Sequence, residues 1–148
     1  MEAWLKGDYL VSTDPSLLDV EAIHAFLTRS YWAEGIAKSV VARAIEHSLC
    51  FGLYQGKTQI GYARVITDRT AFAYLCDVYV LEPHRGKGLG KWLIECVVSH
   101  PDLQGVRRFC LFTKDAHGLY RRVGFTPMVN TDRYMEIFRP VMNRTRQE

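Results

Sequence analysis

Glycine and cationic side chains are concentrated in the stretch PHRGKGLGKWL, residues 83–93. The two kinds of residue alternate along it: Gly86, Gly88 and Gly90, with Arg85, Lys87 and Lys91. Glycine lets an anion approach the backbone closely, and the unpaired N–H groups and dipole at a helix N-terminus attract negative charge. Because an apolar run follows at once, the stretch is a candidate site for a pyrophosphate at the start of a helix.

Two common nucleotide-binding motifs do not fit this stretch. The Walker pattern requires Ser or Thr after its lysine, but Trp92 follows Lys91. The dinucleotide pattern Gly-x-Gly-x-x-Gly would find Lys91 or Leu93 at its last glycine, and the preceding strands form no βαβ unit. The remaining alternative to an anion site is a turn that only redirects the chain, with its lysines in solvent.

Hydrophobic periodicity and turn residues predict the elements that place this stretch. Strands are expected at 8–12, 49–54, 59–68, 71–81, 106–113 and 134–138, and helices at 14–27, 33–48, 89–100 and 115–123. The three consecutive strands from residue 49 to residue 81 are interpreted as an antiparallel meander. The glycine-rich stretch therefore joins the end of a central strand to the start of a helix.

Length and composition predict one domain over residues 1–148, with 48% hydrophobic residues to form its core. The net charge of +3 is too small to indicate a nucleic-acid or membrane-surface protein. Neither a signal peptide nor an apolar run of about 20 residues is found, so a soluble, cytoplasmic protein is expected.

The cysteines and histidines lack the spacing of metal ligands, so no metal site is expected. The cysteines are Cys50, Cys76, Cys96 and Cys110, each within an apolar segment. They are interpreted as buried free thiols, which favours a reducing compartment. The histidines are interpreted as surface or capping residues.

Two segments of the chain resemble signatures of a known family. DVYVLEPHRGKGLGKWL, residues 77–93, contains Arg85-x-x-Gly88-x-Gly90, and AHGLYRRVGF, residues 116–125, follows it. They resemble the Gln/Arg-x-x-Gly-x-Gly/Ala and Ala-x-x-Leu-Tyr-x-x-x-Gly-Phe signatures of the GNAT superfamily of acyl-CoA N-acyltransferases. The resemblance implies an α/β (α+β) fold, with a central mixed, mostly antiparallel sheet that is flanked by helices and splayed at the acetyl-CoA site.

The resemblance also implies how the acetyl-CoA co-substrate is held. Its pyrophosphate would be bound by the backbone amides from residue 85 to residue 90, namely those of Arg85, Gly86, Lys87, Gly88, Leu89 and Gly90. Its pantetheine arm would pair with the backbones of Val78 and Val80 like an added strand, which requires the strands at 71–81 and 106–113 to part. The alternative is a continuous sheet.

Acyl transfer to an amine requires particular groups. An amine with a pKa of about 10.4 must lose its proton before it attacks the thioester, and the oxyanion that forms needs a preorganised donor. The resemblance implies a backbone N–H near Val78 as that donor and Tyr120 as the acid for the departing thiolate, with packing against pantetheine as the alternative role of Tyr120. Asp77, the carboxylate of the central strand, is the candidate base or amine-binding group. Its alternative role is a structural ion pair, with Arg64 as the candidate partner.

The aromatic residues Tyr31 and Trp32, between the first two helices, are candidate acceptor-binding residues, because aromatic faces attract cationic amines. Core packing is the alternative. The expected activity is acetyl transfer from acetyl-CoA to a primary amine, with a small molecule as the acceptor. Protein lysine or N-terminal acetylation, or a non-catalytic acyl-CoA-binding module, are the alternatives. Members of the family often form dimers, so a homodimer is among the expected states.

Overall fold

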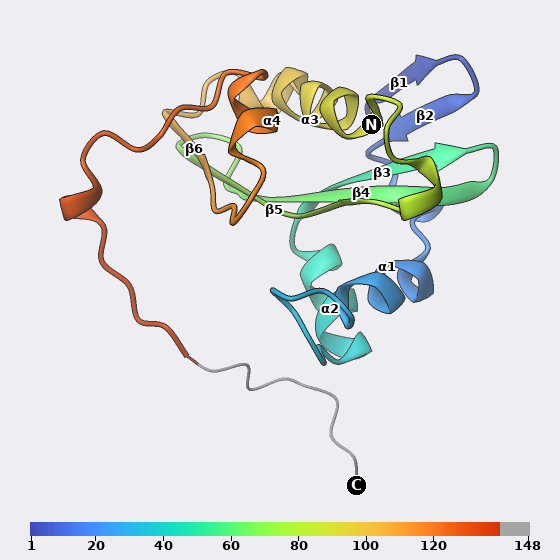
Figure 1. Ribbon diagram of the computed structural model, residues 1–148, viewed down its shortest axis with the longest axis horizontal. Helices are drawn as coiled ribbons and strands as arrows, with labels where there is room; N and C mark the ends of the chain where they lie inside the picture. The colour runs from blue at the N-terminus through green and yellow to red at the C-terminus, as the bar shows by residue number, and fades with distance from the viewer. Residues whose placement is uncertain (140–148) are drawn as a thin grey trace, which may run out of the picture.

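The computed structural model describes residues 1–139, which are built around one sheet with helices on both faces (Figure 1). The strands follow one another in chain order across the sheet: β1 Ala3–Lys6, β2 Tyr9–Ser12, β3 Leu49–Gln55, β4 Thr58–Thr67, β5 Phe72–Val80 and β6 Arg108–Leu111. All neighbouring pairs are antiparallel except β5 and β6, which are parallel. The expected mixed, mostly antiparallel sheet and its central meander are confirmed.

The helices divide between the two faces of the sheet (Figure 1). They are α1 Val20–Leu27, α2 Lys38–Glu46, α3 Leu89–Ser99 and α4 His117–Arg121, with short 3₁₀ turns η1 Pro15–Leu17, η2 Glu82–His84, η3 Pro101–Leu103 and η4 Thr131–Arg133. On the α3 face, Leu93 and Val97 are buried with Phe51 and Val65. On the opposite face, Ile23 of α1 and other helix residues pack on Tyr62 and Tyr79.

The first helix begins later than the sequence pattern predicts. Asp14 and Pro15 were expected to start it, but Asp14 caps η1, where its carboxylate accepts the backbone N–H of Ser16 at 2.9 Å. Leu18 then takes an extended conformation, and Asp19 caps α1 by accepting the N–H of Ala22 at 3.0 Å. Two acidic caps in succession therefore divide the predicted helix into a turn and a shorter helix.

The strand expected at residues 134–138 is wrong, because this segment is not in a strand and pairs with no strand among residues 1–139. After η4 it runs away from the sheet (Figure 1), and Met135, Ile137 and Phe138 are exposed. A strand forms only where another backbone completes its hydrogen bonds, and β6 is instead left at the edge of the sheet. The apolar pattern of the segment is real, but the pairing that it requires is not made within the described chain.

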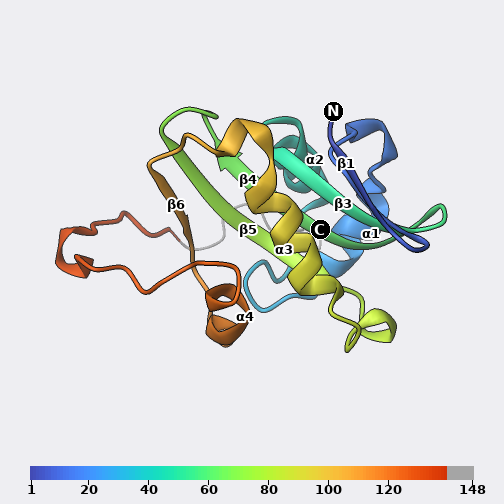
Figure 2. The ribbon, with the colours of Figure 1, turned by 90° about the horizontal axis from the view of Figure 1, so that it is seen from above.

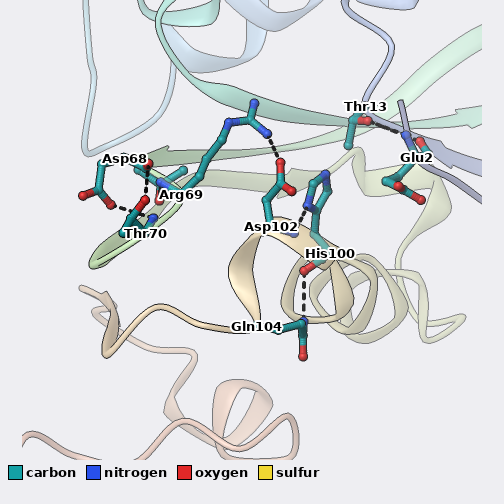
Figure 3. A network of polar contacts seen from close by, with 9 residues as sticks. Glu2, Thr13, Asp68, Arg69, Thr70, His100, Asp102 and Gln104 are labelled. Carbon is teal, nitrogen blue, oxygen red and sulfur yellow. Dashed lines mark hydrogen bonds and ion pairs between the residues drawn. The ribbon is translucent and has the colours of Figure 1, made fainter.

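Polar contacts join the β4–β5 turn to the far end of α3 (Figure 3). Arg69 of the turn forms an ion pair with Asp102 of η3, and Nδ1 of His100 accepts the backbone N–H of Asp102 at 3.1 Å. In the turn itself, the Asp68 carboxylate accepts the backbone N–H groups of Thr70, Ala71 and Phe72. These contacts hold the end of β5 that lies opposite the glycine-rich stretch.

Candidate active site

The parallel pair β5–β6 opens partway along its length. Phe72–Leu75 pair with Arg108–Leu111, whereas Cys76–Val80 of β5 have no partner on β6. Figure 2 shows the two strands diverging toward α4. The expected splay is therefore present, and the backbones of Val78 and Val80 lie at an open strand edge.

A β-bulge interrupts β5 at the place where this opening begins. Tyr62 of β4 faces Tyr79, but Arg64 faces Cys76, so Asp77 and Val78 share the position opposite Ala63. Asp77 has a φ of 55°, which is uncommon for a residue other than glycine. A bulge leaves backbone groups out of the ladder, so the N–H groups at Asp77 and Val78 are candidates to bind an oxygen outside the sheet.

The bulge also shifts, by one residue, which side chains of β5 point to each face of the sheet. Ala73 and Leu75 pack in the core beneath α3, and beyond the bulge it is Val78 and Val80 that pack on that side. Tyr79 consequently points toward α1 and α2. The spacing of three residues between Leu75 and Val78 is a signal of the bulge that strand periodicity alone does not predict.

The Asp77 carboxylate is held at both oxygens. Nε of Arg64 donates to Oδ2 at 2.8 Å, and the indole Nε1 of Trp32 donates to Oδ1 at 3.0 Å. Both partners of the ion pair are largely buried, with side-chain exposures of 16% for Arg64 and 12% for Asp77. The guanidinium also donates to Oγ of Ser48 at 3.1 Å. The ion pair that the sequence offered as an alternative is therefore formed, with Trp32 as an additional donor.

The aromatic pair Tyr31 and Trp32 lies in the loop between α1 and α2, above the bulge. The two rings meet edge to face at 5.1 Å, and Trp32 also packs on Phe26 at 6.2 Å. Both are exposed, which contradicts the alternative of core packing. Nζ of Lys114, from the β6–α4 connection, lies 5.2 Å from the centre of the Tyr31 ring. The loop thus contacts the segment that leads into α4.

Tyr120 on α4 is half-buried, and its ring packs edge to face on Phe125 at 5.8 Å. Burial raises the pKa of Tyr120 to about 12, and the nearby phenol of Tyr31 adds to this effect. The hydroxyl makes no hydrogen bond to another of residues 1–139. A phenol in this state keeps its proton at neutral pH and has a donor to offer.

The glycine-rich stretch forms a turn that leads from η2 into α3. Gly86 and Gly88 have φ values of 81° and 76°, and a Cβ atom on either would point into open space. Gly88 is the N-cap of α3 and provides no side chain to satisfy the first N–H groups of the helix. Nε of Arg85 donates to the Val80 carbonyl at 2.8 Å, which fixes Arg85 against the end of β5. The turn and the open strand edge are therefore directly connected.

The structure brings together most of the residues predicted from sequence and adds others. Asp77 and Trp32 are in contact, and Val80 and Arg85 are in contact. Ser48 and Lys114 were missed. Ser48 precedes β3, whose first residue pairs with Val65, so the register of β3 and β4 was the signal that could have placed it beside Arg64. The sequence carries no signal for Lys114, because its contact with Tyr31 is made between distant loops.

Within residues 1–139 no group of His, Cys, Asp and Glu side chains is arranged to hold a metal ion. In the same part of the chain, no helix has the length and apolar character needed to cross a membrane.

A mixed sheet that opens beside a glycine-rich helix start is the arrangement that the resemblance to acyl-CoA-dependent acyltransferases implies. Comparison with known proteins agrees: the family model described as "Acetyltransferase (GNAT) domain" matches residues 46–127. The chain belongs to this GNAT family of acetyltransferases, and it is therefore an acyltransferase of a family that uses acetyl-CoA.

Three relatives illustrate the similarity. Protein FG08082 of Gibberella zeae, assigned to the acetyltransferases, is 38% identical over an alignment that covers 79% of this chain and 78% of that protein. A GNAT-family crystal structure from Xanthomonas campestris pv. campestris is 51% identical with a TM-score of 0.88, covering 93% of this chain and 97% of that one. A Clostridium acetobutylicum acetyltransferase, solved with acetyl-CoA, has the same fold at 16% identity and a TM-score of 0.63, covering 88% and 94% of the two chains.

Proposed function

We propose that this protein transfers an acetyl group from acetyl-CoA to the primary amine of a small molecule, by direct attack of the amine on the thioester. The observation that carries the proposal is the hydrogen bond from Trp32 to Asp77, which places the aromatic loop over the bulge at the open edge of β5. An acceptor bound by this loop would meet the part of β5, from Cys76 to Val80, that is left without a partner on β6 within residues 1–139.

The open edge and the glycine-rich turn fit the shape and charge of acetyl-CoA. The backbones of Val78 and Val80 would pair with the pantetheine arm, because no strand occupies that edge in the described chain. The pyrophosphate would lie on the backbone amides from Arg85 to Gly90, where a side chain at Gly88 would enter the space that an anion requires. The amides of Gly86 and Leu89 belong to this range, and the side chains of Arg85 and Lys87 would add positive charge.

Acetyl-CoA supplies the thioester carbonyl, and residues of the chain supply the donors and acceptors around it. The N–H of Val78, freed from the ladder by the bulge, would donate to the carbonyl oxygen as negative charge develops on it. Oη of Tyr120 would give a proton to the departing sulfur, since its raised pKa of about 12 keeps the phenol protonated. Asp77 would hold the cationic amine and receive its proton, directly or through water.

The acceptor side favours a slender cationic amine. The Asp77 side chain is 12% exposed and is hydrogen-bonded to the edge of the Trp32 indole, so only a narrow group can reach it. The faces of Tyr31 and Trp32 would attract the ammonium form of such an amine before it loses its proton. Because Oδ1 of Asp77 accepts one hydrogen bond from Trp32, it retains a lone pair for the amine.

The test is release of free coenzyme A thiol from acetyl-CoA in the presence of a panel of amines, with the mass of the acetylated product as a second readout. The panel contains small diamines, amino sugars and amino acids, and peptides with a free lysine or a free N-terminus. We expect turnover with members of the small-molecule group. Turnover with peptides alone would reject the small-molecule acceptor, and binding of acetyl-CoA without turnover on any amine would reject the enzymatic proposal.

A further inference from the structure

Lys114 is a cation beside the candidate active site that the proposed chemistry does not use. It lies in the connection between β6 and α4, which extends from β6 toward the loop between α1 and α2 (Figure 1). The hydroxyl of Thr113 accepts the backbone N–H of Ala116 at 3.0 Å, so a hydrogen-bonded turn encloses Lys114. This turn fixes the backbone from which the lysine side chain projects.

The ammonium group of Lys114 is exposed and packs on an aromatic ring. Nζ lies 5.2 Å from the centre of the Tyr31 ring, within the range of a cation–π interaction. Among residues 1–139 it forms no ion pair with a carboxylate, that of the neighbouring Asp115 included. A lysine ammonium carries three N–H donors and no acceptor. Those of Lys114 are therefore available to an anionic ligand.

A series of contacts connects this ammonium to the Asp77 carboxylate. The ring of Tyr31, on which Lys114 packs, meets the ring of Trp32 edge to face at 5.1 Å. Nε1 of Trp32 then donates to Oδ1 of Asp77 at 3.0 Å. Lys114 and Asp77 are not paired with each other, and two aromatic rings separate them in this series. The aromatic loop thus has a negative group at one end of its contacts and a positive group at the other.

The ammonium on Tyr31 favours one kind of acceptor over another. A diamine bound at Asp77 would carry its second ammonium toward a like charge, which repels it. An acceptor with a carboxylate or a phosphate in that place would instead meet an unpaired cation, and charge-assisted hydrogen bonds of this kind are among the strongest in proteins. The charges of the site therefore favour an amine that also carries an anionic group.

We propose that Lys114 determines acceptor specificity by binding an anionic group, a carboxylate or a phosphate, at the end of the acceptor remote from the reacting amine. The inference rests on the proposed function, because it takes the amine to be held at Asp77. Since two aromatic rings lie between Asp77 and Lys114, the amine and the anionic group must be several bonds apart. An ω-amino acid or an aminoalkyl phosphate meets this requirement, and glycine is too short for it.

The test compares steady-state kinetics for series of acceptors that share the same reacting amine. The series are ω-amino acids of increasing chain length, the corresponding aminoalkyl phosphates, the corresponding diamines, and plain alkylamines as the reference. We expect the native protein to have a lower KM for at least one anionic series than for alkylamines of matched length, and a higher KM for the diamines. The anionic series with the lower KM identifies the carboxylate or the phosphate as the bound group. A lower KM for diamines than for both anionic series would overturn the inference.

Lys114→Met removes the charge and keeps an unbranched side chain on the Tyr31 ring. We expect KM for the preferred anionic acceptor to rise roughly fivefold, the upper end of the range for an exposed ion pair, with little change in kcat. Lys114→Glu should raise this KM further and lower the KM for diamines. Lys6→Met is the matched control, because Nζ of Lys6 makes the other cation–π contact of residues 1–139, at 5.9 Å from the centre of the Trp92 ring. Its loss should leave every KM unchanged.

The kinetics also separate this inference from the proposed function. If amines are acetylated with the same KM by the native protein, Lys114→Met and Lys6→Met, then Lys114 binds no part of the acceptor, and the proposed function stands without it. If no amine in any series is acetylated, the proposed function is rejected and the inference with it.

Discussion

Nε of Arg64 on β4 lies 2.8 Å from Oδ2 of Asp77 on β5, across the bulge that opens the central strand. Burial, the largest single effect, lowers the pKa of the Arg64 guanidinium, but the charge and hydrogen bond of Asp77, together with Cys76 and Tyr62, more than offset it, so the pKa is raised. A carboxylate in this position has two possible uses, to balance Arg64 and to hold an acceptor amine.

Asp77→Asn separates these uses. It leaves Arg64 as a largely buried charge without its partner, and breaking a buried ion pair in this way costs roughly 3 kcal/mol or more. We therefore expect a lower melting temperature. Under the proposed function, kcat/KM for amines also falls, most strongly at low pH, where less free amine exists. Calorimetry and steady-state kinetics on one purified variant measure both effects.

The control for Asp77→Asn is the double variant Arg64→Gln/Asp77→Asn, in which two amides can form a neutral hydrogen bond in place of the ion pair. It should recover most of the lost stability and none of the lost activity. An Asp77→Asn protein that is destabilised but fully active per folded molecule would limit Asp77 to the structural role.

Tyr120→Phe tests the proton donor. If the phenol protonates the departing thiolate, kcat should fall by about 10²-fold, the lower end of the range for general acid catalysis, with little change in acetyl-CoA affinity. Because burial raises the pKa of Tyr120 to about 12, the phenol stays protonated as the pH rises through the range of enzyme assays. Loss of this donor should therefore lower kcat by the same factor from about pH 6 to about pH 9.

The test of Tyr120→Phe compares kcat of the variant with that of the wild type, and measures KM for acetyl-CoA in both proteins to check that binding is retained. Wild-type kcat in the Phe variant would assign Tyr120 to packing against Phe125 and the co-substrate.

Gly88→Val tests the pyrophosphate turn. The residue has a φ of 76°, and an added side chain would point into the space in front of the first turn of α3. We expect isothermal titration calorimetry to show loss of acetyl-CoA binding by at least roughly tenfold, because the side chain would displace the anion from the backbone amides.

The matched control is Gly7→Val, because Gly7 has a φ of 60° and equally open space around a Cβ atom, but lies in the β1–β2 turn. It carries a similar backbone strain without the proximity to α3, so it should lose stability and keep acetyl-CoA affinity. If the two variants lost affinity equally, the effect of Gly88→Val would be one of folding.

Local patterns predicted most of the fold because the strands between Leu49 and Val80 pair with their neighbours in sequence. The contact between Arg64 and Asp77 was accessible for the same reason, since adjacent strands place them side by side. Trp32 reaches Asp77 across 45 residues of sequence, and no periodicity encodes such a contact. The strand expected at 134–138 failed on the same principle: its apolar pattern is local, but a strand also requires a distant partner.

His100 gives the structure a specific sensitivity to acid. The residue is 5% exposed, and its Nδ1 accepts the backbone N–H of Asp102 at the start of η3. Burial holds its pKa below the ordinary value of 6.5. In the pH window between 6.5 and this lowered value, the unfolded chain binds the proton and the folded chain does not. Stability is therefore complete above that window and falls as the pH drops through it.

His100→Asn should reduce this dependence. The Asn side chain can accept the same N–H two residues ahead, as in an Asx turn, but it does not titrate. We expect the fall in melting temperature between about pH 7.5 and about pH 5.5 to be smaller in the variant than in the native chain. Because all other titrating groups are shared, the difference between the two curves isolates His100. If melting temperature fell in parallel with pH in the two proteins, His100 would have the same pKa in the folded and unfolded chain. That result would contradict the effect expected from its burial and its bond to Asp102.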